Sequence, residues 1–486
     1  MNGSALRLLA GALTLQLAAA VSAQPFETPP PPAVPRPLAI AAPVEQALPN
    51  GLRVIVAPRE GVPLVTAMLV VLSGSELDPP QLSGLASMAA SLLTQGTRRH
   101  TGPEIAAAAE ALGGSLESGA GWGQSLVAIT VTTPRLDAAL GLVAEVAREP
   151  TFAPAELERL RNQTLDALKV TYADPGAMAG LTAARLAYGS GAWGHPASGT
   201  PASLPRIGQA DLVALHRATF RPDRAVLILT GDIGPERALV LARTHFGTWA
   251  APAGVAPPRP PAAPTPASGP ALAVVDMPAA GQAGVVLALP LPPRQGAERA
   301  AADVLDTVLG GGYSSRLSQE IRIKRGLSYS VQSRIEARGR SGLFQAALQT
   351  KNESAAEVVS LLQAEIDRVM QAPVPADELA SRKLSLIGGF SRSVETTAGL
   401  ASAIRSLVAS DRSPAELKLR IAALEAVEPA EVQHYAAAHF GAAGRRLAVA
   451  GVAERFVGAL RSGAPGLVVV GQQQLDLERA EGLKRD

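Results

Sequence analysis

The alternation of apolar and polar positions predicts one series of elements twice along the chain. The first series opens with an alternating strand at residues 52–57 and a second extended run at residues 64–72. Thr101 and Glu104 form a capping box that starts one of the helices. The later elements are helices at 81–95 and 102–112, strands at 115–118 and 125–132, and helices at 135–148 and 154–170.

The second series has the same order. Its elements are strands at 272–275 and 284–289, helices at 297–309 and 315–324, strands at 328–336 and 342–349, and helices at 354–370 and 376–391. Each series closes on a late strand, at 225–230 and at 446–450. This repetition indicates an internal duplication, and strands grouped with flanking helices favour an α+β class over a doubly wound parallel sheet.

Two proline-rich stretches divide the chain. One covers residues 24–43 and the other covers residues 251–270, and both read as extended segments without packing partners. These stretches set the predicted boundaries, which are a leader at 24–46, a first domain at 47–250, a linker at 251–270, a second domain at 271–462 and a tail at 463–486.

The N-terminus has the order of regions found in a secretory signal. Arg7 precedes an apolar run from Leu8 to Val21, and small residues end at Ala23. The run is shorter than the roughly 20 residues that a membrane-spanning helix needs. We therefore predict a signal peptide at residues 1–23 and a periplasmic or secreted protein, with an uncleaved anchor as the alternative. No later segment is apolar and long enough to span, so we expect no membrane span after cleavage.

Composition narrows the possible chemistry. The 44 Lys and Arg residues nearly balance the 42 Asp and Glu residues, and the absence of a long basic run argues against nucleic acid as a partner. Cysteine is absent, which excludes disulfides, thiolate metal sites and cysteine nucleophiles. Because aromatic residues make up only 3% of the chain, its cores must be built from aliphatic side chains.

The segments 83–98 and 110–116 resemble the pitrilysin/insulinase family of metallopeptidases. That family binds zinc through His-x-x-Glu-His on a helix, where the two histidines face the same way, and through a glutamate further downstream. The matching positions here are Ser87, Ala90, Ser91 and Ala167, and none of these is a metal ligand. The resemblance implies two homologous α+β domains of the LuxS/processing-peptidase type, each a mostly antiparallel sheet packed with helices.

No other residues restore a metal site. Asp166 neighbours one of the lost positions, but adjacent residues point about 100° apart on a helix. His434 and His439 lie five residues apart, about 140° around a helix, so they do not converge. We expect no cofactor in this chain, and the resemblance places the zinc in a partner subunit.

A second motif, at residues 310–331, resembles the most recognisable segment of the family's C-terminal half. The resemblance implies that Arg322 and Tyr329 contact the peptide substrate beside the scissile bond. Fixed donors at that place stabilise the charge that develops on the carbonyl oxygen. We expect Arg322 near a helix end, a turn at Gly326 and Tyr329 on the next strand, with both side chains in one cleft. The alternative is a surface arginine and a strand-filling tyrosine.

The sequence leaves open the roles of two features near this motif, the triple glycine and Arg316. Gly310, Gly311 and Gly312 resemble a short form of the glycine-rich loop that is associated with substrate selection in relatives, or they form a flexible turn before a helix cap at Ser314. Arg316 is a second candidate donor, although its neighbours favour a solvated helix face. No Gly-Lys-Ser/Thr follows the glycines, so the segment is not a phosphate loop.

The sequence therefore predicts the non-catalytic subunit of a heterodimeric zinc metallopeptidase, inactive alone. Its partners would be a zinc-bearing subunit of the same family and a peptide or unfolded protein substrate. Two alternatives remain, a binding or assembly module that kept the fold without a catalytic role, and a self-sufficient hydrolase.

Overall fold

The computed structural model describes residues 40–262, 269–293, 298–464 and 466–479. The predicted signal peptide and residues 24–39 of the predicted leader lie outside the described residues. Within the described ranges, no helix has the length and apolar character needed to cross a bilayer.

The first of two sheets belongs to the N-terminal half of the chain. Its neighbouring strands are antiparallel except for one parallel pair, β2 with β6. In spatial order the strands are β1 (Val44–Ala47), β2 (Arg53–Pro58), β6 (Ala225–Gly231), β3 (Leu64–Val71), β5 (Ser125–Thr132) and β4 (Glu117–Ala120). β1 therefore lies at the end of the segment predicted as a leader.

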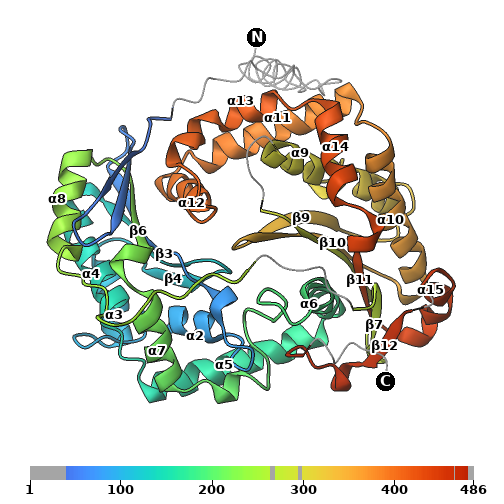
Figure 1. Cartoon of the computed structure of the whole chain (residues 1–486), viewed down its shortest axis with the longest axis horizontal. Helices are drawn as coiled ribbons and strands as arrows, with labels where there is room; N and C mark the ends of the chain where they lie inside the picture. The colour runs from blue at the N-terminus through green and yellow to red at the C-terminus, as the bar shows by residue number, and fades with distance from the viewer. Residues whose placement is uncertain (1–39, 263–268, 294–297, 465, 480–486) are drawn as a thin grey trace, which may run out of the picture. The chain divides into compact units, whose positions relative to one another are not determined.

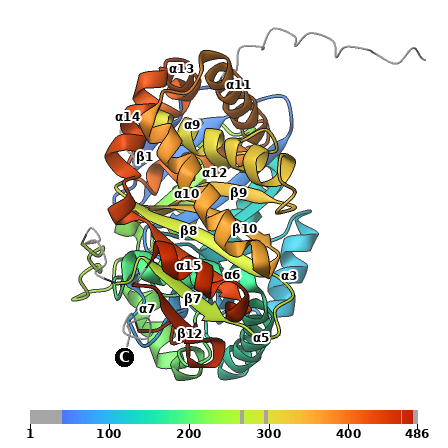
Figure 2. The ribbon, with the colours of Figure 1, turned by 90° about the vertical axis from the view of Figure 1, so that its right-hand side faces the viewer.

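The second sheet belongs to the C-terminal half, and several of its strands can be followed in Figure 2. The order is β12 (Val468–Gly471), β7 (Leu272–Asp276), β11 (Arg446–Gly451), β8 (Ala283–Leu291), β10 (Ser341–Thr350) and β9 (Val331–Arg338). Without β1 and β12 the two sheets have the same strand order, which confirms the predicted α+β fold with two homologous, mostly antiparallel domains. β12 comes from the segment predicted as a tail.

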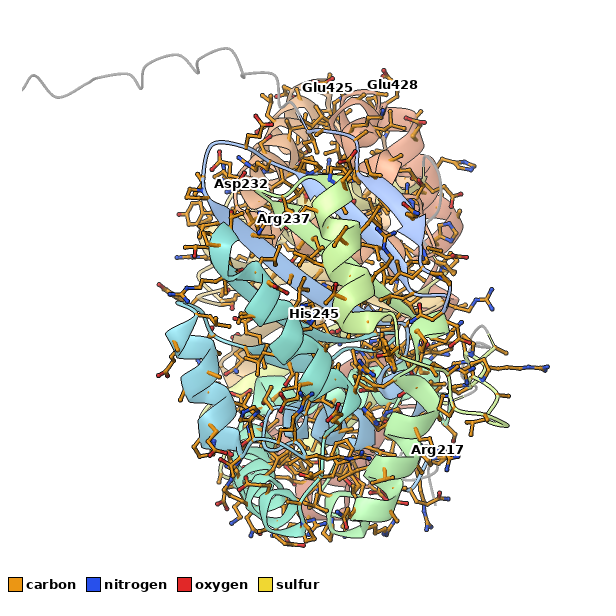
Figure 3. The ribbon with its side chains drawn as sticks, turned by 90° about the vertical axis from the view of Figure 1, so that its left-hand side faces the viewer. Arg217, Asp232, Arg237, His245, Glu425 and Glu428 are labelled. Carbon is orange, nitrogen blue, oxygen red and sulfur yellow. The ribbon has the colours of Figure 1, made fainter. Side chains whose placement is uncertain are left out.

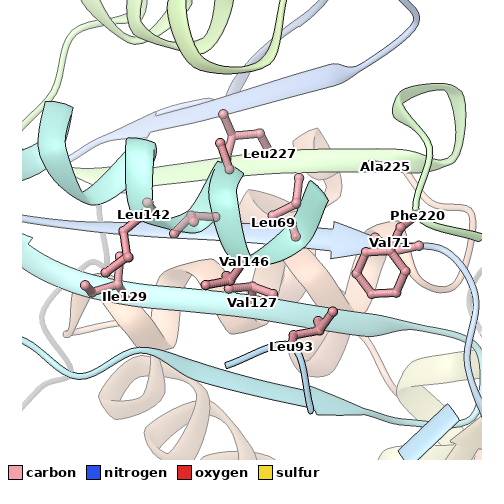
Figure 4. Close-up of a cluster of buried hydrophobic side chains, with 14 of the residues drawn as sticks. Leu69, Val71, Leu93, Val127, Ile129, Leu142, Val146, Phe220, Ala225 and Leu227 are labelled. Atoms are coloured by element: carbon pink, nitrogen blue, oxygen red, sulfur yellow. The ribbon is translucent and has the colours of Figure 1, made fainter. Parts of the chain in front are cut away.

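Each half covers one face of its own sheet with amphipathic helices. In the N-terminal half, α4 packs on β3 and β5, and α8 packs on β2. Figure 4 shows part of the resulting aliphatic core, with Leu69, Val127 and Leu227 from the sheet facing Leu142 and Val146 of α4. The helices of this half are α2 (Leu85–Leu92), α3 (Gly102–Ala111), α4 (Leu136–Arg148), α5 (Pro154–Ala173), α7 (Gln209–Thr219) and α8 (Pro235–Phe246).

The C-terminal half repeats this arrangement with its own helices. Here α10 packs on β8 and β10, while α9 packs on β9 and α14 covers α9 and α10. The helices are α9 (Glu298–Gly310), α10 (Ala355–Gln371), α11 (Ala376–Ser393), α13 (Arg420–Glu425), α14 (Pro429–His439) and α15 (Val457–Gly463).

Two further helices cross between the halves (Figure 1). α6 (Pro175–Tyr188) follows α5 in the N-terminal half but packs on β8, β10 and β11 of the second sheet. Conversely, α12 (Thr397–Val408) follows α11 in the C-terminal half but packs on β3 and β6 of the first sheet. The sequence pattern predicted neither α6 nor α12. Each sheet is therefore covered on its second face by a helix from the other half.

The two crossing contacts differ in chemistry. α6 lies on an apolar surface that includes Val275, Val286 and Leu343, and the hydroxyl of Tyr188 donates to the carbonyl of Gly342 at 2.8 Å. α12 begins with hydrogen bonds to threonines of the first sheet. Thr397 Oγ1 lies 2.8 Å from Thr66 Oγ1, and Thr230 Oγ1 donates to the carbonyl of Thr397 at 2.7 Å.

Candidate functional site

The residues at the positions of the family's zinc motif lie on α2. Two of them take part in the packing of the fold, since the Ser87 hydroxyl donates to the carbonyl of Ala197 at 2.7 Å and Ala90 is buried. Ser91 is half-buried one turn further along. α2 is shorter than the predicted 81–95 because it starts only after Gly84, whose φ of +92° no helix interior has. The Asp78 carboxylate accepts hydrogen bonds from the backbone N–H groups of Gly84 and Ala86, both at 2.9 Å. It therefore caps the start of α2, although it lies several residues before the helix in sequence.

The downstream position, Ala167, is exposed on α5, and α5 packs against α2. Across the described ranges, no three His, Cys, Asp or Glu side chains gather in a way that would hold a metal ion. The four family positions carry two hydroxyl groups, of Ser87 and Ser91, and two methyl groups, of Ala90 and Ala167. The hydroxyl of Ser87 is already hydrogen-bonded within the fold. This set does not fit zinc, which takes imidazole, thiolate or carboxylate ligands.

The C-terminal motif forms a π-helix rather than the α-helix predicted at 315–324. The element η5 (Ser318–Ile323) carries Arg322 near its end, and its wider turn is closed by a bond from the Lys324 N–H to the carbonyl of Gln319 at 3.0 Å. A π-turn accommodates one extra residue, and such turns are frequent at functional sites. Gly326, with φ of +63°, then reverses the chain as predicted.

Arg322 lies between two tyrosine rings. Its Cζ is 4.8 Å from the centre of the Tyr329 ring and 4.9 Å from the centre of the Tyr313 ring, which is the distance of a cation–π contact. In the described part of the chain its guanidinium makes no hydrogen bond or ion pair. Tyr313 is 63% exposed and Tyr329 is 86% exposed, whereas Arg322 between them is half-buried.

This geometry corrects part of the sequence interpretation. Tyr329 lies in a bend two residues before β9, which begins at Val331, so it is not on a strand as predicted. The structure nevertheless brings Tyr329 to Arg322. The side chain of Tyr329 is too exposed to fill a strand face, so the alternative of a strand-filling tyrosine is wrong.

Arg316 does not lie on a solvated helix face. Its guanidinium pairs with the Glu378 carboxylate of α11 at 2.8 Å, and only 15% of its side chain is exposed. Ser314 does not cap a helix through its hydroxyl either. Its Oγ and carbonyl accept hydrogen bonds from Arg382, also on α11, at 2.6 and 2.5 Å. The favoured reading of Arg316 and the cap at Ser314 are both wrong, because α11 supplies partners that are distant in sequence.

The glycine loop has packing and backbone reasons for its composition. A Cβ at Gly310 would lie 2.2 Å from the backbone N of Ser333 on β9, and a Cβ at Gly311 would lie 2.6 Å from Cα of Thr307. Gly312 has φ of +143° and no atom within 4 Å of its missing Cβ. The first two glycines allow close approach, and the third allows the turn that presents Tyr313.

The two other basic residues that follow Arg322 are paired with a carboxylate. Lys324 and Arg325 both bind the Glu320 carboxylate, and their hydrogen bonds lower the pKa of Glu320. Beneath η5, Glu365 of α10 is 2% exposed, and burial raises its pKa. Two exposed aromatic rings beside one cationic donor, Arg322, which is unpaired within the described ranges, suit a polar, carbonyl-rich ligand such as a peptide backbone.

Sequence reasoning missed Tyr313 and Arg382. One available signal was that Tyr313 directly follows three glycines in a chain with only five tyrosines. It also missed a buried group between the halves, where Arg338 stacks on Trp122 at 4.4 Å and donates to the carbonyl of Trp193 at 2.7 Å. In the same group, the Trp193 Nε1–H donates to Glu76, and burial raises the pKa of that carboxyl.

Comparisons with known proteins agree with this picture. Residues 53–185 match the domain described as insulinase (peptidase family M16), and residues 206–386 match the peptidase M16 inactive domain. An uncharacterised zinc protease of Mycobacterium tuberculosis is 30% identical over 360 residues, covering 73% of this chain and 81% of the relative. A Helicobacter pylori protein called a non-peptidase homolog is 27% identical over 320 residues, covering 65% and 72%.

Solved structures show the same fold. The peptidase M16 inactive domain from Pseudomonas fluorescens superposes with a TM-score of 0.78 at 24% identity, covering 84% of this chain and 98% of that one. The first half of the periplasmic protease PqqL from Escherichia coli gives a TM-score of 0.68 at 15% identity, covering 86% and 93%. With its two matching domains and its relatives along most of its length, this chain belongs to the insulinase family, peptidase family M16.

Proposed function

We propose that this chain is the non-catalytic subunit of a two-chain zinc peptidase and that Arg322 and Tyr329 contact the substrate in trans. One observation carries the proposal. In a chain without the family's zinc ligands, an arginine with no other polar partner in the described ranges is held between exposed tyrosines. The match to the M16 inactive domain supports the same reading.

The chemistry divides between the subunits. The partner's zinc would supply the activated water, and this chain would supply donors to the peptide. Arg322 carries a permanent charge and a fork of N–H donors, so it binds and orients a substrate carbonyl and stabilises the negative charge that grows on its oxygen. The Tyr329 hydroxyl adds one donor. Such contacts accelerate the reaction when they are stronger in the transition state than in the bound substrate.

The N-terminal signal pattern is the basis for placing this complex in the periplasm or outside the cell. The expected partner is a family member that carries His-x-x-Glu-His. The expected substrate is an extended peptide or an unfolded protein, because backbone carbonyls are what the exposed donors recognise.

The test is reconstitution with the zinc-bearing subunit that co-purifies with this chain. Hydrolysis of an internally quenched peptide should appear only in the mixture. Arg322→Ala should lower kcat by about 100-fold, as expected for the loss of a transition-state donor, and Tyr329→Phe by about fivefold for the loss of one neutral hydrogen bond. Arg217→Ala is the matched control, since Arg217 is an exposed arginine on α7 (Figure 3).

A fully active mixture that contains both Arg322→Ala and Tyr329→Phe would overturn the proposed role. That result, together with retained assembly, would favour the second candidate, a peptide-binding or assembly module without catalytic function. The name of the Helicobacter pylori relative, a non-peptidase homolog, is the observation that favours this candidate.

A further inference from the structure

The chain fixes the backbone on both sides of Tyr313. Before it, Gly312 turns the chain with φ of +143°. After it, Ser314 is held through its Oγ and its carbonyl by Arg382, a residue that is 8% exposed. Behind the loop, Gly310 packs directly against Ser333 of β9. A loop anchored at three points presents one large side chain to solvent, and that side chain is a tyrosine.

The ring of Tyr313 contacts Arg322 as closely as the ring of Tyr329 does, at 4.9 and 4.8 Å. A free arginine side chain populates many rotamers, and ordering them opposes binding. The two rings restrict the guanidinium through cation–π attraction. Because this contact is with ring faces and not with oxygen acceptors, the N–H groups of Arg322 remain available to a substrate.

We propose that Tyr313 is a positioning residue that holds the Arg322 guanidinium in place for the peptide carbonyl. This inference rests on the proposed function. It assigns the triple-glycine loop a specific task, which is to carry Tyr313 to Arg322, in place of direct selection of substrate by the glycines.

The kinetic test uses the reconstituted two-chain enzyme and an internally quenched peptide. Tyr313→Leu removes the ring but keeps an apolar side chain, and it should lower kcat by about two- to fivefold, the range of one exposed cation–π contact. Tyr313→Phe keeps the ring and should retain the wild-type kcat. KM should change less than kcat, because a displaced donor weakens the transition state more than ground-state binding. In the Arg322→Ala background, Tyr313→Leu should have no further effect.

A second measurement needs no partner. Phenylglyoxal modifies accessible guanidinium groups, and peptide mapping reports the rate at each arginine of the isolated chain. Tyr313→Leu should raise the modification rate of Arg322 about two- to fivefold by the same contact, while the rate at Arg217 stays unchanged. Because Tyr313 is 63% exposed, its replacement leaves the core packing intact.

The outcomes separate the two ideas. If Arg322→Ala leaves kcat unchanged, the proposed function fails. If Arg322→Ala lowers kcat but Tyr313→Leu changes neither kcat nor the modification rate of Arg322, the role of Tyr313 is refuted alone. Equal losses in Tyr313→Leu and Tyr313→Phe would also refute it, because the hydroxyl rather than the ring would then carry the effect.

Discussion

The contact between α6 and the second sheet depends on one glycine of β8. A Cβ at Gly284 would lie 2.2 Å from the carbonyl oxygen of Pro175, 2.4 Å from its carbonyl carbon and 2.5 Å from the backbone N of Gly176. All three atoms belong to the backbone at the start of α6, so no side-chain rotation can relieve the overlap. Gly284→Ala therefore forces α6 away from β8.

The size of the effect follows from that geometry. Ordinary contact between such atoms requires about 3.5 Å, so α6 must retreat by roughly 1 Å, enough to lose between a quarter and a half of the attraction of each contact. Overpacking of a tight contact costs about 1–3 kcal/mol. Because the added Cβ overlaps backbone atoms of α6 that cannot rotate away, we expect Gly284→Ala to lower the free energy of unfolding by about 3 kcal/mol, at the upper end of that range.

Urea unfolding followed by tryptophan fluorescence is a suitable assay. Trp122 and Trp193 lie in the apolar cluster under α6, whereas Trp249 lies in the core of the N-terminal half. Gly119→Ala is the matched control, since Gly119 is a strand glycine with no atom within 4 Å of its missing Cβ, and it should change stability by less than about 0.5 kcal/mol. Equal stabilities for the two variants would refute the argument from close approach.

Three further predictions follow from other contacts. Tyr188→Phe should lower the free energy of unfolding by about 1–2 kcal/mol in the same urea assay, because it leaves the buried carbonyl of Gly342 without the Tyr188 hydroxyl. Burial lowers the pKa of His216 below its usual 6.5, so the unfolded chain takes up that proton more readily and stability falls as pH drops below about 6.5. His216→Gln, which keeps a donor for Ala147, should flatten the dependence of unfolding free energy on pH between pH 7 and 5, and an unchanged slope would contradict the assignment. In the isolated chain, neither EDTA nor one equivalent of ZnCl₂ should shift Tm, whereas a rise of several degrees with zinc would reveal a ligand set that α2 and α5 do not provide.

The repeated order of strands was predictable because each strand has an apolar run bounded by turn residues. The two crossing helices were not. α6 is rich in alanine and glycine, so its apolar stripe contrasts weakly with its other faces. α12 has a clear apolar stripe that includes Leu400, Ile404 and Leu407. For both helices, the surface that they cover belongs to the opposite half and cannot be read from local spacing. The start of α2 was placed too early because Gly84 and the distant cap from Asp78 override the apolar spacing. The π-turn in η5 has the same local composition as an α-helix, so sequence spacing alone does not reveal it.

Part of the candidate site could also be predicted from the sequence, and part of it could not. Arg322 and Tyr329 came from a resemblance, and the structure shows that they are in contact. Tyr313 lies nine residues from Arg322, and its place at the ring contact depends on how Arg382 anchors the loop from α11. The partners of Arg316 and Ser314 also lie on α11, 62 and 68 residues away in sequence. Contacts over such separations follow from the fold and not from local spacing.

The exchange of α6 and α12 changes what the internal duplication means. A sequence repeat suggests two bodies of which each is complete in itself. Here an isolated N-terminal half would leave β3 and β6 bare on one face, and an isolated C-terminal half would expose Val275, Val286 and Leu343 to water. The two repeats therefore complete each other, and the unit that folds is the pair.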